Sequence, residues 1–386
     1  MPPAAKGQSQ LLSGVPTDYY APNYKVEVEG QELHPESKGD ILEVKVVMDG
    51  ENMTSFDLSI NNWDATNFRF KYSDTHLFDV GNRVHIQMGY ANRLLSMMRG
   101  QIMTLAPRFP ESGQPTLGVS GQDGMVKLRE SRPAQGQTVK YIKKSDSEIA
   151  KVVAQRHKLR FKVDESGEQH PLVIQKNQDD AQFLMERAKR IDFECYVHTN
   201  PESGEETLHF LKPIDGRGSA GIKVYELEWG KNLMSFNPRL TLSRQVGQVT
   251  VRGWSPATKS VISYTATSRD LPPGERGRGT SGPQAVQRSL GSRQDVMIDA
   301  PVASEQEAQD LAVSLLRERA YEFITGSGQI IGLPDLRPAD NLILKGLGTR
   351  FSGRYYVKKV EHTLGNNGYL TNFEVRQIYD GGTRRQ

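Results

Sequence analysis

The stretch Arg83-Val84-His85-Ile86-Gln87-Met88-Gly89-Tyr90 alternates apolar and polar side chains, as a β-strand with one buried face does. The same period of two recurs at 41–47 and at 55–60, and turn signals such as Asp49-Gly50 separate the runs. Because no helical pattern intervenes, the region predicts an antiparallel β unit, a barrel or a sandwich. We expect it to span residues 23–139.

A helical pattern begins near residue 140. Ser145 and Glu148 have the spacing of a capping box, which predicts a helix over 146–158. A second helix is expected after Asn177, because apolar residues then recur on one helical face. Short strand patterns follow at 193–198 and 207–211, so residues 140–232 are expected to form a small α+β insert.

Strand patterns return in the last third of the chain, interrupted by one helix at 304–323 that opens with a Ser304–Glu307 capping box. The segment 270–297 is rich in Gly and Pro, which favours a flexible loop. With 233–386 as a second β-barrel domain and 1–22 as a flexible arm, the predicted fold is mainly β: two similar β-barrels flanking a small α+β module.

Composition excludes several classes of protein. The 386 residues carry 49 Lys and Arg against 46 Asp and Glu, a net charge of +3, which disfavours a dedicated nucleic-acid binder. The single cysteine, Cys195, excludes an intramolecular disulfide framework and a Cys-rich metal site. No apolar run is long enough for a transmembrane helix, and no signal peptide is expected.

Two sequence motifs are candidate ligand sites. Residues 277–282 match G-x-G-x-x-G, but a dinucleotide site needs a helix after the turn, and none is expected past Pro283. His198 and His209 are placed to face each other across a hairpin, where a metal would need a further ligand. Two exposed strand residues are the favoured interpretation of this pair.

The remaining candidates for chemistry also have structural explanations. Asp179 and Asp180 are adjacent in a helix, so they point in different directions and suit the helix dipole better than acid–base catalysis. Cys195 has apolar neighbours and is expected to be an inert thiol. Arg276 and Arg278 fit either an anionic partner or a solvated loop. We therefore predict no catalytic, cofactor-binding or metal-ligating residue, and no enzyme.

Four segments, in order, resemble the phage late control D family. The run 78–90, followed by Arg99-Gly100-Gln101-Ile102, resembles that family's strand core, and 117–123 continues it. Residues 178–194 are similar to a signature shared with VgrG spike proteins, although Asp179 stands where many relatives carry Ser and Asp192 where they often carry Gly. Residues 353–369 resemble the closing hairpin.

The resemblance implies a structural baseplate hub of a contractile phage tail or injection system. In that family the hub is a homotrimer that adapts the hexameric inner tube to the trimeric spike. The implied partners are copies of the chain, the inner tube protein, a spike protein, other baseplate components and any cargo in the lumen. No cofactor, specific nucleic acid or membrane anchor is implied. The protein would be made in the bacterial cytoplasm and assembled into a phage tail or extracellular injection particle.

Because the sequence ends soon after its last strand, we expect a separate spike protein and no peptidoglycan hydrolysis. Two alternatives stay open: a tail-associated cell-wall hydrolase and a host-surface-binding β protein. The second needs exposed Trp and Tyr residues grouped on loops, whereas Trp63, Trp229 and Trp254 are far apart in sequence and mostly in strand patterns. Phage, pyocin, extracellular and type VI systems are not distinguished.

Overall fold

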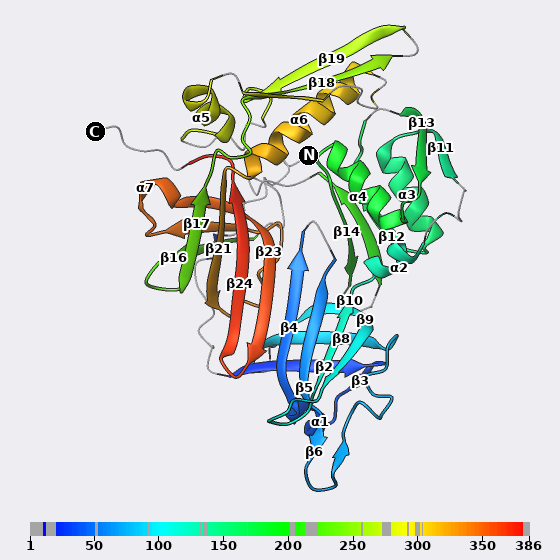
Figure 1. Ribbon diagram of the computed structural model, residues 1–386, viewed down its shortest axis with the longest axis vertical. Coiled ribbons are helices and arrows are strands. Elements are labelled where there is room, and N and C mark those ends of the chain that lie inside the picture. Colours follow the sequence, from blue (N-terminus) through cyan, green and yellow to red (C-terminus); the bar gives the residue numbers. More distant parts are fainter. Residues whose placement is uncertain are drawn as a thin grey trace, which may run out of the picture.

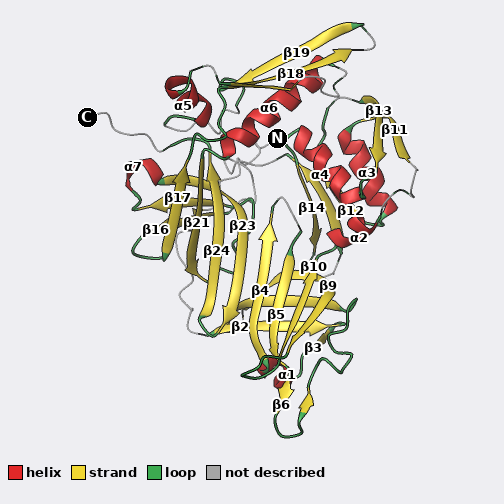
Figure 2. Ribbon diagram, viewed as in Figure 1, coloured by secondary structure: helices red, strands yellow, loops and turns green. Residues whose placement is uncertain are grey.

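The computed structural model describes residues 11–12, 21–50, 53–91, 93–131, 133, 138–167, 169–200, 205–212, 223–255, 258–271, 279–291, 293–297, 302 and 304–380. Strands dominate these residues and helices are fewer, which confirms the mainly-β prediction (Figure 2). Closure of either β unit into a barrel is not detected within these ranges. The two-barrel arrangement therefore stays a prediction.

The first β unit is an antiparallel sheet in the order β4-β5-β10-β9-β8-β2-β3. Its alternating strands bury one face, and Ile86 and Met88 of the opening stretch are fully buried. Gly121 is required by a close approach, because a Cβ there would lie 2.0 Å from the Gln101 carbonyl oxygen. The strands are β2 (Pro22–Val28), β3 (Gln31–Glu32), β4 (Ile41–Asp49), β5 (Ser55–Asn61), β8 (Arg83–Tyr90), β9 (Arg93–Arg108) and β10 (Thr116–Gln122), with helix α1 (Pro35–Gly39).

The insert packs helices against two small sheets, β11–β13 and β12-β15-β14. The predicted capping box forms, since Ser145 accepts from the Glu148 backbone and Glu148 accepts in return. The elements are α2 (Met125–Glu130), β11 (Thr138–Lys144), α3 (Asp146–Arg156), β12 (Arg160–Val163), β13 (His170–Lys176), α4 (Asp180–Arg190), β14 (Glu194–Thr199) and β15 (Glu206–Leu211).

The insert's boundaries differ from the expected 140–232. Met125 and Leu128 of α2 lie in its hydrophobic core, which ends at Phe210. Strand β16 (Val224–Glu228) instead pairs with β22 of the second β unit. The sequence did not predict these limits, because a short element such as α2 or β16 has no local pattern that shows which hydrophobic core it packs into.

The second β unit has the order β16-β22-β23-β24-β21-β17. Part of the predicted arm contributes to it, because β1 (Leu11–Leu12) pairs in parallel with β16. Residues 1–10 and 13–20 of that arm lie outside the described residues. The other elements are β17 (Ser235–Leu240), β21 (Ile324–Ile331), β22 (Asn341–Lys345), α7 (Gly348–Phe351), β23 (Gly353–Gly365) and β24 (Gly368–Gln377).

Strand β23 belongs to both β units. Its first residues, from Gly353 to Tyr356, pair with β22, and its later residues, from Lys359 to Gly365, pair with β4. A register shift between Val357 and Lys359 separates the two pairings in the β24 ladder. The two β units, expected as separate domains, therefore share one hydrogen-bonded sheet and lie side by side (Figure 1).

Side chains reinforce this seam between the β units. The Tyr90 hydroxyl donates to the Gly332 carbonyl at 2.8 Å, and Arg337 Nη2 donates to the Ser96 carbonyl at 3.0 Å. Burial lowers the pKa of the Arg337 guanidinium. His362 donates from Nε2 to the Leu336 carbonyl, and burial lowers its pKa to about 3. The seam thus combines backbone pairing with buried polar groups that all have partners.

A third layer covers one end of the molecule. Helix α6 (Glu305–Tyr321) lies against the hairpin of β18 (Gln248–Ser255) and β19 (Ser260–Thr267), with β20 (Gln294–Met297) beside it (Figure 1). Helix α6 matches the helix expected at 304–323, and Ser304 caps it by accepting from the Glu307 backbone.

The flexible loop predicted for 270–297 is wrong over part of its length. Helix α5 (Gly282–Ser289) and strand β20 occupy this segment, and residues 272–278 lie outside the described range. Ser281 and Gln284 form a capping box at the start of α5. Pro283 is tolerated in the first turn, where a backbone N–H has no helical partner to lose. Composition alone therefore misassigned the helix.

Candidate assembly interface

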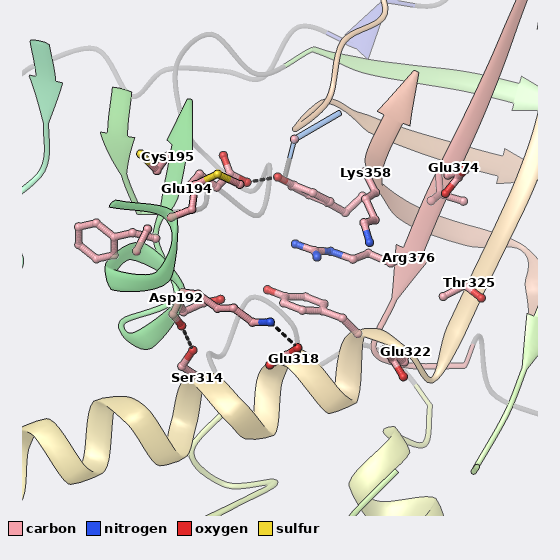
Figure 3. A pocket seen from close by; sticks show the side chains of 18 of the residues that line it. Asp192, Glu194, Cys195, Ser314, Glu318, Glu322, Thr325, Lys358, Glu374 and Arg376 are labelled. Carbon is pink, nitrogen blue, oxygen red and sulfur yellow. Dashed lines mark hydrogen bonds and ion pairs between the residues drawn. The ribbon is translucent and has the colours of Figure 1, made fainter. Parts of the chain in front are cut away.

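A cavity of about 950 Å³ opens where the insert, α6 and the second β unit meet (Figure 3). Its walls come from α4 and β14 on one side, α6 on a second, and β17, β21, β23 and β24 on the third. Both signs of charge line it, since Glu194, Glu318 and Glu374 face Lys358 and Arg376. Such a mixed lining suits a polar partner segment, because charged groups there can be satisfied by a partner's own polar groups.

Arg376 of β24 is held between two tyrosine rings in this cavity. Its guanidinium carbon lies 3.8 Å from the ring centroid of Tyr321 and 4.7 Å from that of Tyr356. The Tyr356 hydroxyl donates in turn to the Glu194 carboxylate. Burial raises the pKa of Tyr356 well above its ordinary value, so the phenol stays protonated. This chain of contacts connects α6 and the second β unit to the insert.

Helix α6 is also attached directly to the end of α4. The Ser314 hydroxyl donates to the Lys189 carbonyl at 2.5 Å, and Lys189 Nζ lies 2.8 Å from the Glu318 carboxylate. Arg317 forms an ion pair with Asp192. The insert is therefore joined to α6 by polar contacts.

A charged cluster marks a second contact between the insert and α6. His170 of β13 lies between Asp146, at 3.2 Å from Nε2, and Glu307 of α6. Arg187 Nε donates to Asp146 at 2.5 Å. Burial opposes charging of the imidazole, but the hydrogen bonds to the two carboxylates outweigh it and raise the pKa of His170 to about 9. The histidine therefore bridges two carboxylates as a cation at neutral pH.

An aromatic tip projects at the opposite end of the molecule (Figure 1). The hairpin of β6 (Trp63–Asp64) and β7 (Arg69–Phe70) carries Trp63, Phe68 and Phe70, and Phe109 joins them after β9. The rings of Phe70 and Phe109 are 5.2 Å apart, and those of Trp63 and Phe70 are 5.5 Å apart. Phe68 is 80% exposed and Phe109 62%. Clustered, exposed aromatic rings are typical of a surface that binds another molecule.

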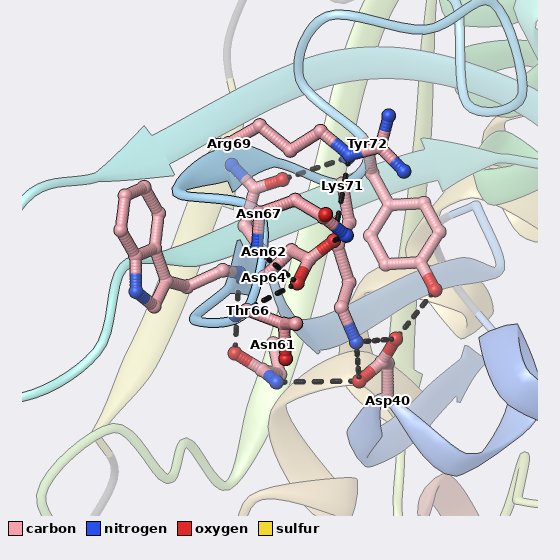
Figure 4. A network of polar contacts seen from close by, with 10 residues as sticks. Asp40, Asn61, Asn62, Asp64, Thr66, Asn67, Arg69, Lys71 and Tyr72 are labelled. Atoms are coloured by element: carbon pink, nitrogen blue, oxygen red, sulfur yellow. Dashed lines mark hydrogen bonds and ion pairs between the residues drawn. The ribbon is translucent and has the colours of Figure 1, made fainter.

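Polar contacts hold the base of this hairpin (Figure 4). Asp40 accepts from Lys71 Nζ at 2.8 Å, from the Tyr72 hydroxyl at 2.7 Å and from Asn61 Nδ2 at 3.2 Å. Burial of Asp40 is outweighed by these donors, which lower the pKa of the carboxyl. Within the turn, Asp64 accepts from the backbone N–H groups of Thr66 and Asn67. The tip is therefore presented on a rigid support.

The β18–β19 hairpin exposes a further apolar pair. Trp254 and Val261 lie directly opposite each other across the two strands, and both side chains are exposed. The alternate residues Val251 and Ile262 are buried on the other face, where α6 packs. Exposed apolar residues thus occur at both ends of the long axis of the molecule (Figure 1).

The carboxylates considered for catalysis have structural roles. Asp179 caps α4 by accepting from the Gln182 backbone N–H at 2.7 Å. Asp180 is buried and binds Arg156 at 3.1 Å and His157 at 2.7 Å. Cys195 lines the cavity only as a buried thiol, and burial raises its pKa to about 12. Asp179, Asp180 and Cys195 are buried and engaged in capping, ion pairing and packing, respectively, whereas a nucleophile or a general base must be accessible to a substrate.

The glycine motif does not form a phosphate site in its described part. Gly277, Arg276 and Arg278 lie outside the described residues. At the start of α5, a Cβ on Gly282 would lie 2.0 Å from Gln245 Oε1, and the Thr280 backbone N–H donates to Asp380 at 2.7 Å. Protein groups therefore fill the space that a pyrophosphate would need.

The histidine pair is not assembled into a described metal centre. The ring of His209 stacks on Tyr196 at 4.8 Å, while the His198 side chain lies outside the described part. Among the side chains that are described, no group of three His, Cys, Asp or Glu is placed to hold a metal ion. None of the described helices combines the length and apolar character needed to cross a membrane.

Sequence reasoning missed both the aromatic tip and the arginine stack. A signal for the tip was present, because three aromatic residues lie within 63–70 around a polar turn. The three tryptophans alone gave no sign of it, because Trp63 is far in sequence from Trp229 and Trp254. No local signal marks the stack, since Tyr321, Tyr356 and Arg376 come from three separate elements.

Comparison with known proteins gives a family and a fold. The sequence profile described as the Alg8 N-terminal domain matches residues 20–366. A 43 kDa tail protein of prophage MuSo2 from Shewanella oneidensis is similar in structure, with a TM-score of 0.68, 14% identity, and coverage of 93% of this chain and 99% of that one. A tail protein from Neisseria meningitidis gives a TM-score of 0.65 at 13% identity, covering 93% and 98%.

A component of the Escherichia coli type VI secretion system is also similar, with a TM-score of 0.56 and 12% identity over 94% of this chain and 79% of that one. No curated protein matches the sequence. At these identities the likeness establishes the fold, which is that of phage tail and type VI secretion proteins.

Proposed function

This chain belongs to the family of the Alg8 N-terminal domain, and from that premise we propose that it is the structural baseplate hub of a contractile, phage tail-like injection system. Its fold is shared over more than nine-tenths of its length with tail proteins from two bacteria and with a type VI secretion component. The role rests on that likeness together with the surfaces described above.

The observation that carries the proposal is the pairing of β23 with both β22 and β4. A shared sheet fixes two β units side by side in each chain. Three such chains in a ring would present six β units, which matches a hexameric inner tube on one side and a trimeric spike on the other. We propose that the hub is a homotrimer with this adaptor function, assembled into a phage tail or an extracellular particle.

The exposed apolar residues support a position between partners. Phe68 and Phe109 lie at one end of the long axis, and Trp254 and Val261 at the other. A monomer that left both groups in water would lose the stabilisation that their burial provides. The inner tube protein, a separate spike protein and other baseplate components are the proposed partners.

We propose no enzymatic step for this chain. Several charged groups of the cavity lining pair within the chain, as Glu194 does with Tyr356 and Lys189 with Glu318, and its cysteine is buried with a raised pKa. A zymogram that shows clearing of peptidoglycan by the purified protein would contradict this part. The aromatic tip also favours a second candidate, binding of a host-surface molecule, because the exposed rings of Phe68 and Phe109, backed by the partly buried Trp63 and Phe70, suit a sugar or protein ligand.

Native mass spectrometry tests the hub proposal. We expect the purified full chain to form trimers, and to form a larger complex with the inner tube protein of the same particle. The variant Phe68→Ser/Phe109→Ser should retain the fold and lose a tip contact, whereas Val80→Ser, at another exposed position, serves as the control. A monomer that binds neither tube nor spike protein would overturn the proposal. Binding of host cells by the tip, with no tube contact, would favour the second candidate.

A further inference from the structure

The outer face of the β11–β13 sheet has an apolar centre exposed to solvent. Ile142 is 63% exposed, Leu172 49% and Ile174 46%. Ile142 and Leu172 lie directly opposite each other in the register, and Ile174 is opposite Lys140. The inner face carries Tyr141, which stacks on Phe183 of α4 at 5.5 Å. The two-stranded sheet is therefore a supported platform with one unpartnered side.

Lysines lie beside this apolar centre, two of them toward one end of the same face. Lys140 lies on the same face opposite Ile174, Lys176 is opposite Thr138, and Lys143 follows Ile142 in β11. None of the three forms an ion pair with a described residue, in contrast to Lys25, Lys45 and Lys71 elsewhere in the fold. We name Lys140, Ile142, Leu172, Ile174 and Lys176 the β11 face.

Glu148, which follows β11 in the sequence, has other partners. It accepts from the Ser145 backbone N–H at 2.8 Å and from Gln169 Nε2 at 3.1 Å, and its charge acts on Lys144. Among the described residues it forms no ion pair with Lys140 or Lys176. The face keeps a net positive potential that an acidic partner would complement.

The strand edge offers backbone groups as well. Within the described residues, β11 and β13 pair only with each other. Strand β13 contains Pro171, which has no N–H to donate, whereas β11 contains no proline. The edge of β11 has no proline, and its register is regular over residues 138–142, whereas Lys143 has a positive φ of 49° and lies outside the paired register. Residues 138–142 therefore offer the row of donors and acceptors that an added strand requires.

We propose that the β11 face binds an extended acidic segment of a partner protein, in which apolar side chains alternate with Asp or Glu. The segment would add as a strand along the edge of β11. Its apolar side chains would cover Ile142, Leu172 and Ile174, and its carboxylates would meet Lys140 and Lys176. This inference concerns the insert alone and goes beyond the proposed hub role.

Other anionic ligands fit the face less well. A single-stranded nucleic acid is bound through aromatic stacking platforms, and the β11 face has none. A membrane surface is bound by a broad amphipathic face, usually with aromatic anchors, whereas here the face is narrow and has three aliphatic side chains, with two lysines toward one end. The spacing of two residues along each strand matches a partner strand in register.

The test mixes the full chain with a fluorescein-labelled peptide of ten residues in which Glu and Val alternate. Fluorescence anisotropy of the peptide measures its binding. We expect saturable binding that weakens as salt rises. Lys140→Glu/Lys176→Glu should weaken binding about tenfold or more, from two screened charge contacts. The charge-matched control Lys158→Glu/Lys162→Glu changes two exposed lysines of the same insert that form no described ion pair, and should leave binding unchanged.

A second measurement separates strand addition from loose charge attraction. Hydrogen exchange at residues 138–142 should slow when the peptide is bound, and Leu172→Glu should abolish that protection while circular dichroism shows a folded chain. Equal weakening by the control variant, or equal affinity for a peptide with Lys in place of Glu, would overturn the proposal. So would tighter binding of phosphatidylserine vesicles or oligodeoxythymidine than of the peptide. Protection of 138–142 by self-association alone would assign the face to a second copy and would also overturn it.

Discussion

Two junctions hold the units of this chain together, and they are built differently. The seam between the β units is a continued β-ladder from β23 to β4, reinforced by Arg337 and by the buried His362. The junction of the insert with α6 and the second unit is a cavity of about 950 Å³ crossed by ion pairs and by the Arg376 stack. Backbone pairing fixes the β units to each other, while the insert depends on side chains.

The difference also gives the two junctions opposite responses to pH. His362 has a folded-state pKa of about 3, below its value of about 6.5 in the unfolded chain, so the seam loses stability as the pH falls below about 6.5. His170 has a folded-state pKa of about 9, so its contribution is complete below about 6.5 and is lost as the pH rises through 9. We infer from the two kinds of junction that backbone pairing holds the β units rigidly to each other, whereas the insert, attached through side chains, is held less rigidly.

The largest effect is expected at the seam. Arg337→Met removes a part-buried guanidinium that donates to the carbonyls of Ser96, Pro334 and Leu336. We expect a loss of about 3 kcal/mol in the free energy of unfolding, because three backbone acceptors lose a charged donor. Urea denaturation measures it.

The matched control for this variant is Arg350→Met, at an exposed position in α7, which should change the free energy of unfolding by less than about 0.5 kcal/mol. Similar losses in the two variants would show that the seam does not depend on Arg337.

The arginine stack should contribute less than the seam but should act on the insert. Arg376→Met removes two cation–π contacts, each of about 1 kcal/mol, so we expect a loss of about 2 kcal/mol. Hydrogen exchange should rise in the last turns of α6 and remain unchanged in β4. Arg239→Met, an exposed residue that lines the same cavity, is the control. Faster exchange in β4 as well would mean that the two junctions are not independent.

The contribution of the His170 cluster to stability should depend on pH, which distinguishes the insert junction from the seam between the β units. The stability difference between the native chain and His170→Gln should be about 1–2 kcal/mol at pH 6, an amount that allows for solvent screening of the cluster. The difference should begin to shrink above about pH 6.5 and should be lost as the pH rises through 9, where the imidazolium loses its proton. Thermal unfolding of both proteins across this range measures it. A difference that grows with pH would contradict the assigned charge state.

Much of the fold was predictable because it depends on local patterns. The alternation at 83–90 and the caps at Ser145 and Ser304 report directly on which side chains are buried and where helices start. The sharing of β23 was not predictable, since its alternating pattern suits any neighbouring strand. Helix α5 was missed because Gly and Pro dominate the residues before its cap.

The candidate interface was less predictable than the fold. The burial of Cys195 and the capping role of Asp179 follow from their neighbours in sequence. Tyr321, Tyr356 and Arg376 meet only because α6 crosses the end of the second sheet, which is a tertiary fact without a local signature. The aromatic tip is intermediate, since its residues are close in sequence but their exposure is decided by packing.

The smallest effect is expected for the ion pair between Lys189 and Glu318, which spans the same junction as the Arg376 stack. Both side chains are substantially exposed, although Nζ lies 2.8 Å from the carboxylate. Solvent screening and the entropy cost of ordering a lysine leave such a pair with about 0.5 kcal/mol or less. A double-mutant cycle of Lys189→Met and Glu318→Gln should give a coupling energy in that range. A coupling above about 1.5 kcal/mol would mean that exposed charges hold the insert, and the junction would then weaken steeply with salt.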